Sequence, residues 1–122
     1  GFYINTTTEQ WVKHYRMEDY IMRELPEIIS SNFPVLEGRE SIFGHSMGGH
    51  GALTLALKYP GRFKSVSAFS PICAPSQCPW GEKAFTNYLG ENREVWQKHD
   101  ANELIKSTKF EIPMLIEQGG DE

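Results

Sequence analysis

The chain has 122 residues, of which 39% are hydrophobic and 12% aromatic, and this composition is typical of a globular domain rather than a disordered segment. Its net charge is −4, and the sequence has no basic stripe of the kind that binds a nucleic-acid backbone. It also has no apolar run approaching the roughly 18 residues that cross a bilayer. We therefore expect neither a nucleic acid nor a membrane as a partner.

The first part of the chain predicts a loop, a helix and a strand, in that order. Residues 1–10 are polar and rich in threonine, which favours a loop. Apolar residues then recur at helical spacing over residues 15–30, and the Asn-Phe-Pro run at 32–34 ends the helix. Pro26 lies inside this pattern, where we expect a kink or a tightened turn. The short apolar stretch 41–43 predicts a buried strand.

The remainder of the chain alternates between predicted helices and strands. Residues 47–58 are rich in alanine and leucine and predict a helix, which the Tyr-Pro-Gly run at 59–61 ends. The segments that follow predict strands at 65–69 and 113–117, a proline-containing loop at 70–81, and short helices near 83–88 and 95–106. This order indicates an α/β fold with a parallel sheet and crossover helices. In such sheets, ligands bind at the carboxyl ends of the strands.

The segment Gly44-His45-Ser46-Met47-Gly48 matches the G-x-S-x-G pattern of a nucleophile elbow. A predicted strand precedes it and a predicted helix follows it, which is the context that the pattern requires. The two glycines would remove Cβ atoms that collide with the neighbouring strand and helix. The pattern therefore predicts Ser46 as a nucleophile, with the backbone N–H of Met47 as a donor to the oxyanion. These features favour an α/β-hydrolase fold.

In that fold the catalytic serine is followed along the chain by an acid and then by a histidine. The segment after the strand at 113–117 ends in Asp121 and Glu122, and both stay candidates for the acid. Asp121 is favoured by residue type, and Glu122 by its position three residues after Gly119. All four histidines precede these acids, so none fits the order: His14, His45, His50 and His99.

The missing histidine predicts that residues 1–122 are the central part of a single domain, truncated at both ends. The catalytic histidine would follow residue 122, and the second oxyanion donor would precede residue 1. We expect His14 and His99 to lie on the surface and His50 to face away from the Ser46 hydroxyl. We also expect this polypeptide alone to be inactive.

Cys73 and Cys78 lie in the predicted loop at 70–81. Two cysteines do not make a disulfide framework, and a zinc site needs more ligands at matching spacing. We expect two reduced thiols, with a local disulfide as the alternative.

The sequence resembles the S-formylglutathione hydrolase family, also called the esterase D family, over essentially its whole length. The strings that carry the resemblance include SIFGHSMGGHGAL at 41–53, KSVSAF at 64–69 and CPWG at 78–81. The chain departs from the family at Glu117, where the family usually has aspartate. An ungapped comparison sets Glu122, rather than Asp121, against the catalytic aspartate of the family, so both acids stay open.

The resemblance implies a cytoplasmic serine thioesterase that hydrolyses S-formylglutathione to formate and glutathione, a step of formaldehyde detoxification. It further implies cleavage of short-acyl carboxylic esters, a homodimer, and no cofactor or metal. Trp80 would border the site and bind the glutathione part of the substrate. Two alternatives stay open: another short-acyl carboxylesterase of the same fold, and a non-catalytic hydrolase-like module that has lost its triad.

Overall fold

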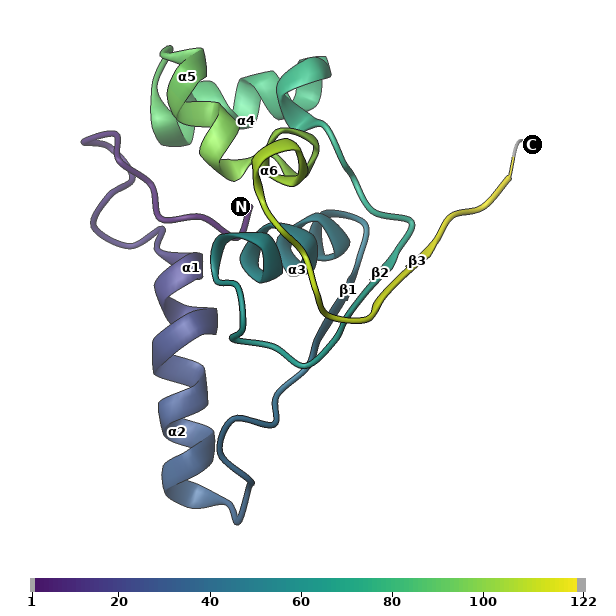
Figure 1. The fold of residues 1–122 in the computed structure, drawn as a ribbon. Coiled ribbons are helices and arrows are strands. Elements are labelled where there is room, and N and C mark those ends of the chain that lie inside the picture. The colour runs from purple at the N-terminus through teal and green to yellow at the C-terminus, as the bar shows by residue number, and fades with distance from the viewer. Residues whose placement is uncertain (1, 121–122) are drawn as a thin grey trace.

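A computed structural model describes residues 2–120 of the chain (Figure 1). Its strands are β1 (Ile42–His45), β2 (Val66–Phe69) and β3 (Met114–Glu117). Its α-helices are α1 (Met17–Asp19), α2 (Leu25–Asn32), α3 (Met47–Lys58), α4 (Pro79–Leu89), α5 (Arg93–Trp96) and α6 (Ala101–Ser107). Three further helical turns are η1 (Tyr20–Glu24), which is π-helical, and the 3₁₀ turns η2 (Pro75–Gln77) and η3 (Gln97–His99).

The three strands form one parallel sheet in the order β1-β2-β3. His45 lies beside Phe69, and Phe69 beside Glu117, so all three strands end at the same edge. Helix α3 connects β1 to β2, and helices α4 to α6 connect β2 to β3. The parallel sheet with crossover helices that the sequence predicts is therefore confirmed.

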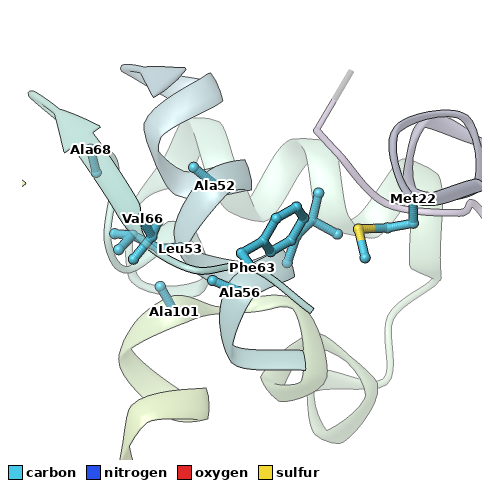
Figure 2. Close-up of a cluster of buried hydrophobic side chains, with 9 residues drawn as sticks. Met22, Ala52, Leu53, Ala56, Phe63, Val66, Ala68 and Ala101 are labelled. Atoms are coloured by element: carbon cyan, nitrogen blue, oxygen red, sulfur yellow. The ribbon is translucent and has the colours of Figure 1, made fainter. Parts of the chain in front are cut away.

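The main core lies between the sheet and α3, because α3 is rich in alanine and can approach the strands closely. Figure 2 shows Val66 and Ala68 of β2 near Ala52 and Leu53 of α3, with Ala101 of α6 nearby. Helices α4, α5 and α6 lie together at one end of the molecule, and the helical segment α1–α2 extends from the other side (Figure 1).

The helix expected over residues 15–30 is present. Of the two alternatives expected at Pro26, a kink or a tightened turn, the tightened turn is wrong and the kink stays a prediction. The preceding turn, η1, is widened into a π-helix. Proline has no N–H, so it cannot donate to the Met22 carbonyl four residues earlier as an α-helix would require. The Arg62 guanidinium donates to that oxygen instead, at 3.2 Å. A side chain from a distant segment thus satisfies the carbonyl that the proline leaves free.

Two further expectations for the region after β2 need correction. The loop expected at 70–81 already ends at Cys78, because Pro79, Trp80 and Gly81 form the first turn of α4. The helix expected over residues 95–106 is broken at Asp100, whose extended backbone separates η3 from α6. The Asp100 carboxylate accepts from the backbone N–H groups of Asn102 and Glu103, and so caps α6.

Within residues 2–120, none of the helices combines the length and the apolar composition that crossing a membrane demands.

Candidate active site

Ser46 lies between the end of β1 and the first residue of α3, with φ 55° and ψ −116°. Positive φ is unfavourable for a residue with a side chain, so the surrounding contacts must hold this conformation. The Ser46 N–H donates to the Phe69 carbonyl at 2.9 Å, and the Ser46 carbonyl accepts from the N–H groups of His50 and Ile72. These hydrogen bonds fix both backbone groups of Ser46, and its side chain is partly exposed.

The two glycines of the motif, Gly44 and Gly48, differ in the space available for a Cβ atom. A Cβ on Gly44 would lie 2.1 Å from the Gly48 carbonyl oxygen, so β1 and α3 can meet only if residue 44 is glycine. A Cβ on Gly48 would meet no described atom closer than the Tyr3 hydroxyl at 3.7 Å. The expectation that both glycines prevent collisions is therefore confirmed for Gly44 and wrong for Gly48.

The helix that starts at Met47 directs its first N–H groups toward the region of Ser46. The first N–H groups of an α-helix have no partner within the helix and carry its positive dipole end, so they favour a developing negative charge. The Met47 side chain packs against a second apolar cluster, which includes Phe2 and Phe85. Ser46 and Met47 also line a cavity of about 420 Å³ between β1 and α3.

A second serine, Ser70, also has positive φ, at 44°, and directly follows β2. It shares the sheet edge with Ser46, and its N–H donates to the Glu117 carbonyl at 2.7 Å. However, no helix starts after Ser70, because residues 71–74 have no regular structure. Ser46 is the serine of this pair that has a helix N-terminus next to it.

Both candidates for the acid, Asp121 and Glu122, lie outside the described residues. The strand that leads to them, β3, ends at Glu117 beside Phe69 of β2. Adjacent strands are about 4.8 Å apart, so the end of β3 lies roughly 10 Å from the end of β1. The choice between the two acids stays a prediction.

The four histidines occupy three kinds of environment: exposed, half-buried and buried. His14 and His45 are exposed, as expected for His14. The expectation that His99 lies freely on the surface is wrong. It is half-buried with its Nδ1 atom 2.5 Å from the Lys58 amine, and burial, with help from Lys58, lowers its pKa to about 3.

His50 is buried on α3, and nothing in the sequence indicates a polar partner for it. Its Nε2 atom accepts from the Ala101 N–H at 3.3 Å, which requires a neutral ring with the proton on Nδ1. Burial, opposed by the Asp100 charge, lowers the pKa of His50 to about 4. His50 therefore joins α3 to α6 as a neutral acceptor.

Trp80 lies in the first turn of α4 and is 54% exposed. Its ring contacts Phe2 with a centroid distance of 5.3 Å, and the Phe2 ring also contacts His50. An exposed indole held from one side can offer an apolar surface to a ligand, but its role in binding stays a prediction.

Cys73 and Cys78 are both free thiols, so the preferred expectation for this pair is confirmed over a local disulfide. Burial raises the pKa of the Cys73 thiol. Among residues 2–120, no group of three or more His, Cys, Asp or Glu side chains is arranged to hold a metal ion.

Comparison with known proteins extends over the whole chain. Residues 1–122 match the family model described as "Putative esterase". The S-formylglutathione hydrolase of Rattus norvegicus is 54% identical over 123 residues, which are 100% of this chain and 44% of the rat protein. The S-formylglutathione hydrolase of Arabidopsis thaliana is 53% identical over 121 residues, which are 98% of this chain and 42% of the plant protein.

Among solved structures, an S-formylglutathione hydrolase from Agrobacterium tumefaciens superposes with a TM-score of 0.93 at 49% sequence identity. The match covers 99% of this chain and 44% of the bacterial protein. The chain thus spans less than half the length of these relatives. The match of the family model to every residue, together with this superposition, shows that the chain belongs to the esterase family and has part of an α/β-hydrolase fold.

Proposed function

We propose that a full-length polypeptide containing residues 1–122 is a serine thioesterase that hydrolyses S-formylglutathione to formate and glutathione. It would also cleave short-acyl carboxylic esters. The observation that carries this proposal is Ser46, held with positive φ between a parallel strand and a helix N-terminus. The identity of 54% to a relative named S-formylglutathione hydrolase supports the choice of substrate.

In the first chemical step, the Ser46 Oγ attacks the formyl carbonyl carbon and its proton passes to a histidine. That histidine lies outside residues 1–122, and Asp121 or Glu122 orients it. The carbonyl oxygen becomes an oxyanion, to which the Met47 N–H donates. The tetrahedral intermediate then breaks its C–S bond and leaves a formyl group on Ser46.

The leaving group is the glutathione thiolate, which needs little protonation because the pKa of a thiol is about 8.5. The protonated histidine passes the serine proton to the departing sulfur, and the neutral histidine then takes a proton from the water that attacks the formyl-serine ester. The resulting intermediate releases formate, and the proton returns to the Ser46 oxygen. No step of this sequence requires a cofactor or a metal ion.

The two sides of the substrate place different demands on the site. A formyl group is the smallest acyl group, so the acyl side of the site can be narrow, whereas the thiol side must hold a tripeptide. Trp80 is suited to the thiol side, because it is exposed at the N-terminus of α4 and the connection that leads to it follows β2. The proposal includes a cytoplasmic location and a homodimer, both from the resemblance of the sequence.

The test of the nucleophile is Ser46→Ala, with Ser70→Ala as the matched control. Both serines have positive φ at neighbouring strand ends, so both changes put alanine into a similar backbone strain. We expect Ser46→Ala to lower kcat for S-formylglutathione by about 10⁴-fold or more, because it removes the attacking atom. Ser70→Ala should stay within about tenfold of the unsubstituted enzyme.

A loss of equal size in both variants would contradict the assignment of Ser46. Comparing kcat/KM for S-formylglutathione with that for p-nitrophenyl acetate and a feruloyl ester tests the substrate. A preference for either ester would favour another esterase of the same fold.

A further inference from the structure

The carboxylate of Asp100 is completely buried and accepts hydrogen bonds from two separate segments of the chain. Its Oδ1 atom caps α6 by accepting from the N–H groups of Asn102 and Glu103. Its Oδ2 atom accepts from the N–H of Ser76 at 3.1 Å and from the Ser76 hydroxyl at 2.5 Å. Capping of α6 by itself would need only the two hydrogen bonds to Oδ1. The second pair ties η2 to the start of α6 through a charge-assisted bond.

The position of η2 determines the position of Trp80. A Cβ on Gly81 would lie 2.1 Å from the Pro75 carbonyl oxygen, so the first turn of α4 rests directly on the backbone of η2. Trp80 precedes Gly81 in that turn. A shift of Ser76 therefore moves the backbone that carries the indole.

The start of α6 is also linked to Ser46, through His50. The N–H of Ala101, next to Asp100, donates to the buried His50 ring at 3.3 Å. His50 lies one helical turn after Ser46, and its N–H donates to the Ser46 carbonyl at 3.1 Å. Hydrogen bonds from His50 to Ser46 and to Ala101, and from Ser76 to Asp100, thus link Ser46 to the segment that carries Trp80, with the backbone between Asp100 and Ala101 joining them.

An apolar path connects the same two ends. The Phe2 ring lies 5.7 Å from His50 and 5.3 Å from Trp80, between ring centroids. It is also 5.2 Å from Phe85 of α4, in the cluster against which Met47 packs. Two sets of contacts, which meet at His50, therefore link the Ser46 turn to Trp80.

We infer that Asp100, with His50 and Ser76, positions the Trp80 segment relative to Ser46 and thereby sets affinity for the thiol side of the substrate. This inference rests on the proposed function for its choice of substrate. The three residues are positioning residues, because they act through η2 and α4. Loss of the bond between Asp100 and Ser76 moves Trp80 but leaves the Ser46 turn held by its own backbone hydrogen bonds.

Two variants separate this role from capping. Ser76→Ala removes the hydroxyl bond to Asp100 and leaves the carboxylate in place. Asp100→Asn replaces one oxygen by an NH₂ group, which cannot accept from Ser76, while the remaining oxygen still caps α6, since asparagine is as good a cap as aspartate. The matched control is Asn92→Ala, which removes the cap of neighbouring α5, where Asn92 accepts from the Glu94 N–H.

In the full-length enzyme, we expect Ser76→Ala and Asp100→Asn to raise KM for S-formylglutathione about tenfold and to keep kcat within about twofold. Their kcat/KM for p-nitrophenyl acetate, which lacks the glutathione part, should also stay within about twofold. Asn92→Ala should leave both substrates unaffected. Equal losses with both substrates, or an unchanged KM in a folded variant, would overturn the inference.

A structural measurement tests whether the Asp100–Ser76 hydrogen bond positions Trp80, and it needs no substrate. In NMR spectra, both variants should shift the indole N–H signal of Trp80, whereas Asn92→Ala should not. If the Trp80 signal does not move, the positioning role fails even where S-formylglutathione is hydrolysed. If it moves but the unsubstituted enzyme does not hydrolyse S-formylglutathione, the positioning role holds and the proposed function fails.

Discussion

Ser46 and His50 are one helical turn apart, yet their surroundings differ in every respect. Ser46 is partly exposed, has a strained backbone and lies at the edge of the sheet. His50 is buried in regular helix and holds a neighbouring helix by accepting a single hydrogen bond. Backbone strain is retained at Ser46, the residue proposed as the nucleophile. The buried acceptor atom of His50, by contrast, has a hydrogen-bond partner, as buried polar atoms normally do.

The buried state of His50 makes the free energy of unfolding depend on pH. Its folded pKa is about 4, below the ordinary value of 6.5, mainly because burial disfavours the charged ring. The charges that act on it are Asp100, which raises its pKa, and Lys58, which lowers it. As pH falls below about 6.5, the unfolded state binds a proton first, so up to about 3 kcal/mol of stability is lost by pH 4.

We therefore expect the free energy of unfolding of His50→Gln to fall less with decreasing pH than that of the unsubstituted protein. Glutamine can accept the hydrogen bond from the Ala101 N–H without titrating. Urea unfolding between pH 7 and 4.5 measures this. His14→Gln is the control, because His14 is exposed, and it should retain the original dependence. His99, with a pKa of about 3, contributes to the dependence that remains in both variants. An unchanged slope in His50→Gln would show that His50 does not titrate as described.

At the scale of elements, the junction of β1 and α3 depends on one glycine. We expect Gly44→Ala to lower the free energy of unfolding by about 2 kcal/mol or more, because its Cβ would lie 2.1 Å from the Gly48 carbonyl oxygen and the two elements must separate. Gly48→Ala is the matched control, since its Cβ has space and alanine gains about 1 kcal/mol in helix propensity. Urea midpoints measure both changes, and equal destabilisation would contradict this account.

Most elements were predictable because their signals are local. Helix α3 has the bounds expected from its composition and its Tyr-Pro-Gly stop, and the strand–turn–helix around Ser46 follows from the motif. The break at Asp100 has a local signal, because an aspartate three residues before Glu103 is typical of a helix start, whereas the hydrogen bond from Ser76, 24 residues away, was not predictable. The hydrogen bond from Arg62 to the Met22 carbonyl, which Pro26 leaves free, likewise joins distant segments. For the site, the motif specified Ser46 and Met47, whereas the connection through His50 exists only in the folded chain.

At the scale of the whole molecule, α3 covers one face of the described sheet at β2 but leaves β3 exposed, and the opposite face is bare. Val66 and Ala68 of β2 are buried against α3. On the opposite face, Phe43 is 76% exposed and Leu115 is 54% exposed, and the strand register aligns both with Ser67. Parallel sheets are normally covered on both faces, so this face needs an apolar cover that residues 2–120 do not supply.

These surfaces, together with the missing histidine, predict how the polypeptide 1–122 behaves by itself. We expect it to self-associate in size-exclusion chromatography and to bind a hydrophobic dye, because large exposed apolar patches drive association. The double substitution Phe43→Ser and Leu115→Ser should weaken both effects, whereas the control Glu9→Ser and Glu91→Ser, at exposed loop positions, should not.

With p-nitrophenyl acetate, the polypeptide should show no turnover that depends on Ser46, because no histidine is available after the acid to take the serine proton. A monomer that binds no dye would show that the bare face needs no cover, and turnover abolished by Ser46→Ala would show that a base within residues 1–122 suffices.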